Sequence, residues 1–96
     1  MSHDELLNTC TAIISEVMKV DPSYVTPDTS LIHDLGADSL DMLNLIVKVE
    51  ERLAVRLSDK DLVQEGMDGT PRIIDTVRDL LDLLDRKLRQ RVVAET

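Results

Sequence analysis

The residues with the clearest chemical potential are one hydroxyl and three carboxylates in the stretch DLGADSLDM, residues 34–42. Asp34, Asp38 and Asp41 surround Ser39, and Gly36 precedes it by three positions. A polar segment ends here and a strongly apolar one begins, which places Ser39 at the start of an expected helix. Serine and aspartate are both favoured helix N-caps. The simplest interpretation is therefore that Asp38 or Ser39 only caps that helix.

A reactive centre built on Ser39 would need partners that the sequence does not offer. A nucleophilic hydrolase requires a base beside the hydroxyl and a group that orients the base. The only histidines are His3, at the N-terminus, and His33, in an expected loop, and the G-x-S-x-G pattern is missing. A calcium loop fails because no glycine follows Asp38, and no Cys/His cluster suits zinc. We therefore expect neither an autonomous enzyme nor a metal site.

A third kind of site uses all of these features together. A serine in the first turn of a helix presents its hydroxyl beside backbone amides that lack partners. If that oxygen were joined to a phosphodiester, the amides and the helix dipole would favour the anion. Gly36 would let the backbone pass close without a side chain in the way. Ser39 is thus a candidate attachment point that another protein modifies, and the neighbouring acids are a recognition surface for a basic enzyme.

Charge and composition narrow the class of partner. The 96 residues fit one domain and carry a net charge of −8. Acidity concentrates in residues 21–68, which hold eleven acidic and four basic groups. Such a surface repels nucleic-acid phosphates and acidic proteins, and it favours partners with a basic patch. Tyr24 is the only aromatic residue, which disfavours a platform for stacking bases or sugars.

Cysteine use and hydropathy indicate the compartment. Cys10 is the only cysteine, so an internal disulfide is impossible. It falls in an apolar helical stripe, and we expect it to be a core residue rather than a reactive thiol. No signal peptide is visible, and no apolar run is long enough to span a membrane. We expect an intracellular, cytoplasmic protein.

The elements that must position Ser39 are predicted from apolar spacing and capping pairs. Ser2 and Glu5 form a capping-box pattern before an amphipathic helix that ends near Lys19. Residues 20–37 are expected to form a long loop. A second helix should run from about Ser39 to Leu53. Because it is apolar on more than one side, it is either central to the core or offers an exposed apolar strip to a partner.

Two further capping pairs lie later in the chain. Ser58 with Asp61 predicts a short third helix that reaches about Val63, and Thr76 with Asp79 predicts the start of a last helix. The stretch QEGMDGTPR, residues 64–72, links them, and no strand alternation is apparent.

The predicted fold is therefore all-α, a four-helix bundle with three longer helices, one short helix and a long loop between the first two. It would form a single domain over residues 1–96. Its core would span about residues 4–85, and residues 86–96 would be a basic helical extension.

The sequence resembles the acyl carrier proteins, because DLGADSLDM closely matches their modification motif D-L-G-x-D-S-L-[DE]. The segments DPSYVTPDTSL and LIVKVEERLAVRLSDKDL fit the family's loop and second helix. The likeness is close over residues 4–62 and loose over residues 74–85. It implies a single carrier domain in which Ser39 receives 4′-phosphopantetheine from coenzyme A through a separate magnesium-dependent phosphopantetheinyl transferase. The terminal thiol of this arm would hold an acyl group as a thioester, and the carrier itself would catalyse nothing.

The resemblance also implies a surface for acyl-transferring or ketosynthase-type enzymes that carry basic patches. The expected partner-binding residues are Asp38, Leu40, Asp41, Met42, Glu50 and Glu51. Five aliphatic residues are candidates for lining an acyl pocket between helices: Leu43, Ile46, Leu57, Ile74 and Leu80. A shuttle of this kind is expected to be a monomer.

Some positions depart from the family pattern and leave the pathway open. Asn44 stands where many members have Glu, Lys48 adds a positive charge to the same helix, and the 64–72 link and the basic tail are longer. These differences put standard fatty-acid synthases in doubt as partners and point to a specialised lipid, polyketide or aminoacyl cargo, but they do not identify it, so fatty acid, specialised lipid and polyketide biosynthesis all stay open. Two alternatives remain: an aminoacyl carrier loaded by an adenylating ligase, which the Gly36-Ala37-Asp38 lead-in disfavours, and a carrier-like helical interaction protein that is never modified.

Overall fold

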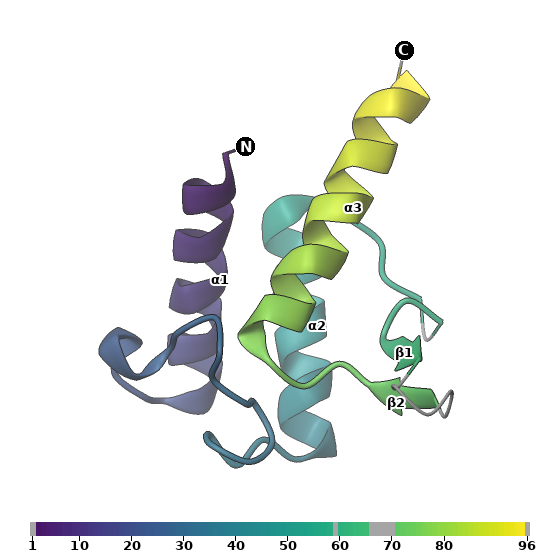
Figure 1. Ribbon diagram of the computed structural model, residues 1–96. Coiled ribbons are helices and arrows are strands. Elements are labelled where there is room, and N and C mark those ends of the chain that lie inside the picture. Colours follow the sequence, from purple (N-terminus) through teal and green to yellow (C-terminus); the bar gives the residue numbers. More distant parts are fainter. Residues whose placement is uncertain (1, 59, 66–70, 96) are drawn as a thin grey trace.

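The computed structural model describes residues 2–58, 60–65 and 71–95. The helices are α1 (His3–Met18), α2 (Ser39–Leu53) and α3 (Val77–Glu95), with a short 3-10 turn, η1 (Pro22–Tyr24), after α1. The two short strands are β1 (Val63–Glu65) and β2 (Pro71–Ile73). Helix α1 packs against both α2 and α3, and the hairpin lies beside the bundle on the side away from α1 (Figure 1). The predicted helical bundle is confirmed.

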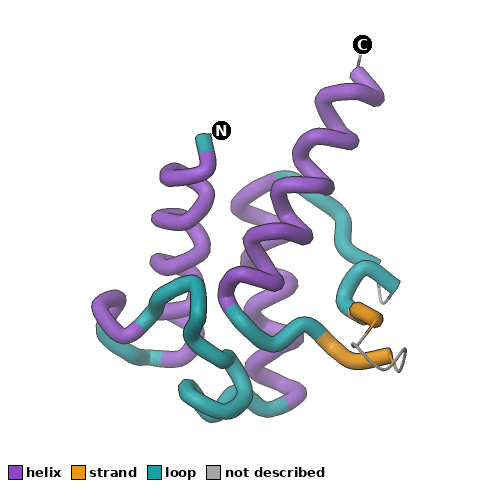
Figure 2. The backbone as a smooth tube through the Cα atoms, in the orientation of Figure 1, coloured by secondary structure: helices purple, strands orange, loops and turns teal. Residues whose placement is uncertain are grey.

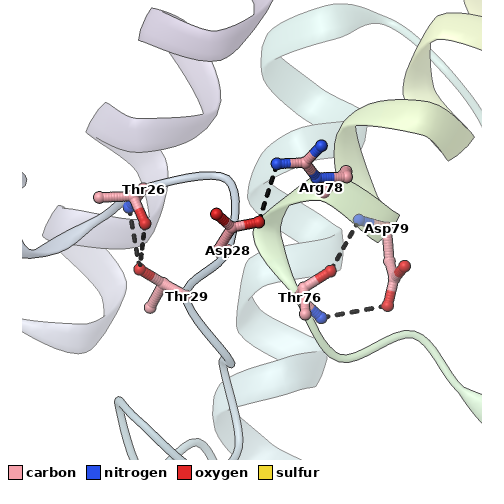
Figure 3. A network of polar contacts seen from close by, with 6 residues as sticks. All are labelled: Thr26, Asp28, Thr29, Thr76, Arg78 and Asp79. Carbon is pink, nitrogen blue, oxygen red and sulfur yellow. Dashed lines mark hydrogen bonds and ion pairs between the residues drawn. The ribbon is translucent and has the colours of Figure 1, made fainter.

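Local capping explains where the helices begin. The Glu5 amide donates to Ser2 Oγ at 3.2 Å, which caps α1 as the sequence predicted. At α3, Asp79 N donates to Thr76 Oγ1 and Thr76 N donates to Asp79 Oδ2, both at 3.1 Å (Figure 3). These reciprocal bonds satisfy amides that the helix itself leaves unpaired.

The core is aliphatic and lies between the three helices. Its largest fully buried members include Leu6, Ile13 and Ile14 of α1, Leu45 and Val49 of α2, and Leu80, Leu81, Leu83 and Leu84 of α3. Helix α3 continues to Glu95, through most of the basic segment that we expected to extend it. The limits of the expected domain core stay a prediction.

The predicted short third helix is wrong. Ser58 N does donate to Asp61 Oδ2 at 2.8 Å, but the described residues between Ser58 and Val63 form a turn, and β1 begins at Val63. Contacts from far along the chain hold this turn. Lys87 Nζ lies 2.9 Å from Asp61 Oδ2, and Ile74 N donates to Leu62 O at 2.9 Å. A capping pair fixes one turn, but strand pairing decides the conformation of the residues after that turn.

The 64–72 link, predicted without strands, contributes to an antiparallel hairpin instead. Val63 pairs with Ile73, Gln64 with Arg72, and Glu65 with Pro71. The two strands are the orange segments in Figure 2. Residues 66–70 of the link lie outside the described residues.

The long loop between α1 and α2 is fixed to the start of α3. Ser30 Oγ donates to Asp75 Oδ1 at 2.7 Å, and Leu31 N donates to Asp75 O at 2.8 Å. Arg78 pairs with Asp28 at 2.8 Å across the same junction (Figure 3). Figure 2 shows the loop running from the end of α1 past the start of α3 to α2. The loop thereby connects all three helices and sets the approach of the chain to Ser39.

Candidate functional site

Ser39 is the first residue of α2, and its side chain is exposed. Asp38 occupies the N-cap position: its Oδ1 accepts from Asp41 N at 2.8 Å, and Asp41 Oδ2 accepts from Asp38 N at 3.2 Å. Among the described residues, Ser39 Oγ has no hydrogen-bond partner. The two carboxylates therefore perform the capping that we had considered for either Asp38 or Ser39, and the hydroxyl is left facing solvent.

The lead-in to Ser39 depends on the backbone of Gly36. Its φ is +72°, in the left-handed region that costs other residues energy. A Cβ atom built there would meet nothing within 4 Å. The surrounding protein atoms therefore leave room for a side chain at this position, and the requirement for glycine is conformational; a close approach of this backbone to an attached group stays a prediction. The next residue, Ala37, is buried, and its amide donates to Leu31 O at 2.9 Å, which anchors the turn just before the helix.

A groove of about 760 Å³ includes Ser39 in its lining. Helix α2 contributes Met42, Leu43, Ile46 and Val47, and the chain after α2 contributes Leu57, Leu62 and Val63. Three of the five residues expected to line an acyl pocket are therefore at this groove. The other two, Ile74 and Leu80, are 0% and 1% exposed in the core and are not among its lining residues.

The expected partner-binding residues occupy the exposed and half-buried sides of α2 and its cap. Asp38 and Glu51 are exposed, and Asp41 and Met42 are half-buried. Leu40 is 63% exposed, and together with the exposed Leu43 and Val47 it forms an apolar strip on the helix. The opposite side of α2 buries Leu45 and Val49, so the helix is both a core element and a source of exposed apolar surface.

Glu50 has a contact that sequence reasoning missed. Its Oε2 accepts the amide of Leu57 at 3.0 Å, and its carboxylate is half-buried at the groove. Leu57 lies four residues after the end of α2. A carboxylate near the end of a helix gives no sequence signal for this bond, because the bond depends on how the chain folds back after Ala54. Glu50 thus holds a groove-lining residue in place.

The cations of α2 pair with α1. Lys48 Nζ lies 3.7 Å from Glu16 Oε1, and Arg52 Nη2 lies 3.6 Å from Glu16 Oε2. Lys48, which departs from the family pattern, is therefore directed toward a neighbouring helix. Both cations are therefore directed toward Glu16 of α1 and away from the acids at the start of α2.

Other candidate groups are structural. Cys10 is fully buried, and removal from water raises the pKa of its thiol to about 12. The amide of His33 donates to Ser30 Oγ at 2.9 Å, and its side chain is exposed.

In residues 2–58, 60–65 and 71–95, no group of three or more His, Cys, Asp or Glu residues could hold a metal ion. No helix in that part of the chain has the length and hydropathy needed to cross a membrane.

Comparisons with known proteins cover the candidate site. The model of a family described as phosphopantetheine attachment site matches residues 10–66. The acyl carrier protein of Thermotoga maritima is 38% identical over 87 residues, covering 91% of this chain and 96% of that protein. The acyl carrier protein of Thermosynechococcus vestitus is 34% identical over 88 residues, covering 92% and 98%. A solution structure of holo acyl carrier protein from Geobacter metallireducens is similar with a TM-score of 0.69 at 29% identity, covering 90% of this chain and 88% of that one.

Proposed function

The chain belongs to the acyl carrier proteins, a family of carriers rather than catalysts, and from that premise we propose that Ser39 bears its prosthetic group. That group is phosphopantetheine, whose thiol supplies thioester chemistry when an acyl group is loaded. The observation that carries the proposal is the exposed Ser39 hydroxyl, left without a partner among the described residues beside the reciprocal Asp38–Asp41 cap.

The backbone around Ser39 fits a phosphodiester at this oxygen. The amides of Ser39 and Leu40, at the first two helical positions, have no acceptor among the described residues, so they remain available to an anion. The carboxylates of Asp38 and Asp41 would repel a free anion at the same place. A covalent bond to Ser39 Oγ overcomes that repulsion, whereas reversible binding of a phosphate would not.

Attachment requires a second protein. Ser39 Oγ would form a bond to the phosphorus of the phosphopantetheine unit of coenzyme A, while the bond from that phosphorus to the adenosine bisphosphate leaving group breaks. The hydroxyl proton would pass to a base of the transferase, because Ser39 Oγ has no hydrogen-bond acceptor among the described residues. Phosphopantetheinyl transferases and acyl-handling enzymes are the usual partners of this family.

The surface proposed to meet these partners combines acids with exposed apolar side chains. Its members are Asp38, Leu40, Asp41, Met42, Glu50 and Glu51. Rim charges raise the rate of encounter with a basic patch without creating a tight interface, which suits a monomeric carrier that must bind and leave repeatedly.

We propose aliphatic acyl intermediates as the cargo and the groove lined by Leu43, Ile46 and Leu57 as the place where the chain is shielded. Fatty acid, specialised lipid or polyketide biosynthesis would use such intermediates, and a cytoplasmic location would give access to coenzyme A.

Native cargo provides the test. The protein would be isolated from its host and treated with hydroxylamine, which cleaves thioesters. The released hydroxamate and the remaining protein would then be identified by mass spectrometry. Release of an aliphatic hydroxamate from a phosphopantetheinylated protein supports the proposal. Release of an amino acid derivative would instead identify an aminoacyl carrier. A protein that stays unmodified in a host with an active transferase would be a helical interaction protein.

A further inference from the structure

The charge of the chain reverses along the second half of α3. Three of the four residues 86–89 are cationic: Arg86, Lys87 and Arg89. Arg89 Nη2 lies 3.1 Å from Asp85 Oδ2, one turn earlier on the helix. Arg86 is exposed and has no ion pair among the described residues. In a chain with a net charge of −8, this part of the surface therefore attracts the opposite kind of partner from the acidic start of α2.

Arg86 lines a small cavity between α3 and the turn before β1, with a volume of about 130 Å³. The turn contributes Lys60 and Asp61 to the lining, and α3 contributes Arg86, Lys87 and Gln90. Lys87 Nζ lies 2.9 Å from Asp61 Oδ2, and this ion pair joins the two walls. Because Lys87 neutralises Asp61, the charges left over are those of Lys60 and Arg86, neither of which has an ion pair within the described part of the chain. The Gln90 side-chain amide adds a neutral hydrogen-bond donor.

The cavity is separate from the surface proposed to meet the transferase. Figure 1 shows α2 beginning at one end of the bundle and α3 ending at the other. None of the residues that line the cavity belongs to the proposed partner surface, and Val63 is the one described residue that lines both the cavity and the groove beside Ser39. An occupant of the cavity would therefore leave Ser39 accessible.

We propose that the cavity is a second docking site, at which a carboxylate from an acidic segment of a partner protein binds to Arg86 and Lys60. A guanidinium can donate two parallel N–H bonds to a carboxylate, and the ammonium adds a second positive charge. A carboxylate side chain can enter a cavity of about 130 Å³ singly. An anionic membrane would instead present a broad negative surface to the exposed Asp82 as well, which lies one turn before Arg86 and would be repelled. The charges thus favour an acidic protein segment.

A site of this kind would hold the carrier on one protein while another acts at Ser39. The two surfaces have opposite charge, so each repels the partners that the other attracts. Binding at the cavity does not require the prosthetic group, so this inference can fail while the proposed function holds, and the reverse is also true.

The test adds a hexaglutamate peptide with blocked ends to the full chain, with hexaglutamine as the neutral control peptide. We expect the side-chain NMR signals of Arg86 and Lys60 to shift with hexaglutamate and not with hexaglutamine, while the amide signal of Ser39 stays in place. Binding should weaken several-fold between low and physiological ionic strength, because salt screens exposed charges.

The variant Lys60→Gln/Arg86→Gln should bind hexaglutamate at least several-fold more weakly than wild type. Arg56→Gln is the matched control, because Arg56 is also exposed, has no ion pair among the described residues and does not line the cavity. It should bind the peptide as wild type does.

Unchanged Arg86 and Lys60 signals in the wild type at high concentrations of hexaglutamate would overturn the inference, and so would equal binding by wild type and the double variant. Binding of inorganic phosphate or of phosphatidylglycerol vesicles without binding of hexaglutamate would identify a different anion site and overturn it as well. The wild-type signals decide the matter even if the double variant fails to fold. None of these results affects attachment at Ser39, which is measured separately by mass.

Discussion

Asp38 and Asp41 satisfy each other's backbone amides at the start of α2, with N···O distances of 2.8 and 3.2 Å. Ser39 stands between them in the sequence and has no part in this exchange. The acids that would attract a basic transferase are therefore the same acids that build the helix start. Substitutions that separate their charge from their hydrogen bonds can tell these two roles apart.

Asp38→Ala removes both roles, while Asp38→Asn keeps an oxygen for the Asp41 amide and removes the charge. We expect Asp38→Ala to lower the free energy of unfolding by about 1 kcal/mol and Asp38→Asn to lower it by much less. Both should slow modification by a transferase at low salt, because electrostatic attraction raises association rates. Urea unfolding and initial modification rates measure the two effects. An Asp38→Asn protein modified as fast as wild type would restrict Asp38 to capping.

Glu50 provides a test of how the groove is held. In Glu50→Ala the Leu57 amide loses its acceptor, which costs about 1 kcal/mol, whereas Glu50→Gln retains an oxygen that can accept. We expect faster hydrogen exchange of the Leu57 amide in Glu50→Ala and near-native exchange in Glu50→Gln. Equal exchange in wild type and Glu50→Ala would show that this bond does not hold Leu57.

Asp61 should contribute to the acid sensitivity of the fold. The hydrogen bond from the Ser58 amide, with a further contribution from Lys87, lowers the pKa of Asp61 below its ordinary value of 3.8. Because the folded pKa is the lower one, the stabilisation is complete above the unfolded value and is lost as the pH falls through the folded value. Asp61→Asn should therefore lose less stability than wild type between neutral pH and the acid side of 3.8. Urea unfolding midpoints of both proteins, at neutral pH and at a pH below 3.8, measure this difference. Equal losses of stability in wild type and Asp61→Asn would contradict the prediction.

Cys10 should be unreactive in the folded protein. Burial raises the pKa of its thiol to about 12, so almost no thiolate exists at neutral pH, and the sulfur is fully enclosed. We expect a chromogenic disulfide reagent to label Cys10 only as fast as the protein opens, with a rate that rises in urea. Rapid labelling without denaturant would contradict the buried position.

Local signals predicted the parts of the fold that local interactions decide. Ser2 with Glu5 and Thr76 with Asp79 each precede an apolar stripe of helical period, so cap and stripe agree on the helix start. Ser58 with Asp61 gives the same cap signal, yet strand pairing between Val63 and Ile73 replaces the helix. Val63 and Ile73 are further apart in the sequence than one helical turn. Residue spacing within the 58–63 segment therefore cannot predict that they pair.

The candidate site likewise has features that the local sequence predicts and features that depend on packing between distant segments. The position of Ser39 at the start of α2 was predictable from the motif and the apolar run after it. The groove was predicted only in part, because helical spacing indicates which residues are apolar but not which of them face outward. Ile74 and Leu80 have the same residue types as Ile46 and Leu43, yet the first two are 0% and 1% exposed in the core, whereas Leu43 is 58% exposed and Ile46, although 8% exposed, lines the groove.

Intact mass after incubation with coenzyme A, magnesium and a phosphopantetheinyl transferase tests the central claim most directly. Wild type and the control Ser23→Ala, which alters another exposed serine, should each gain the mass of one phosphopantetheine, and a folded Ser39→Ala protein should gain none. A Ser39→Ala protein that still gains this mass, or a folded wild type that never does, would contradict the account.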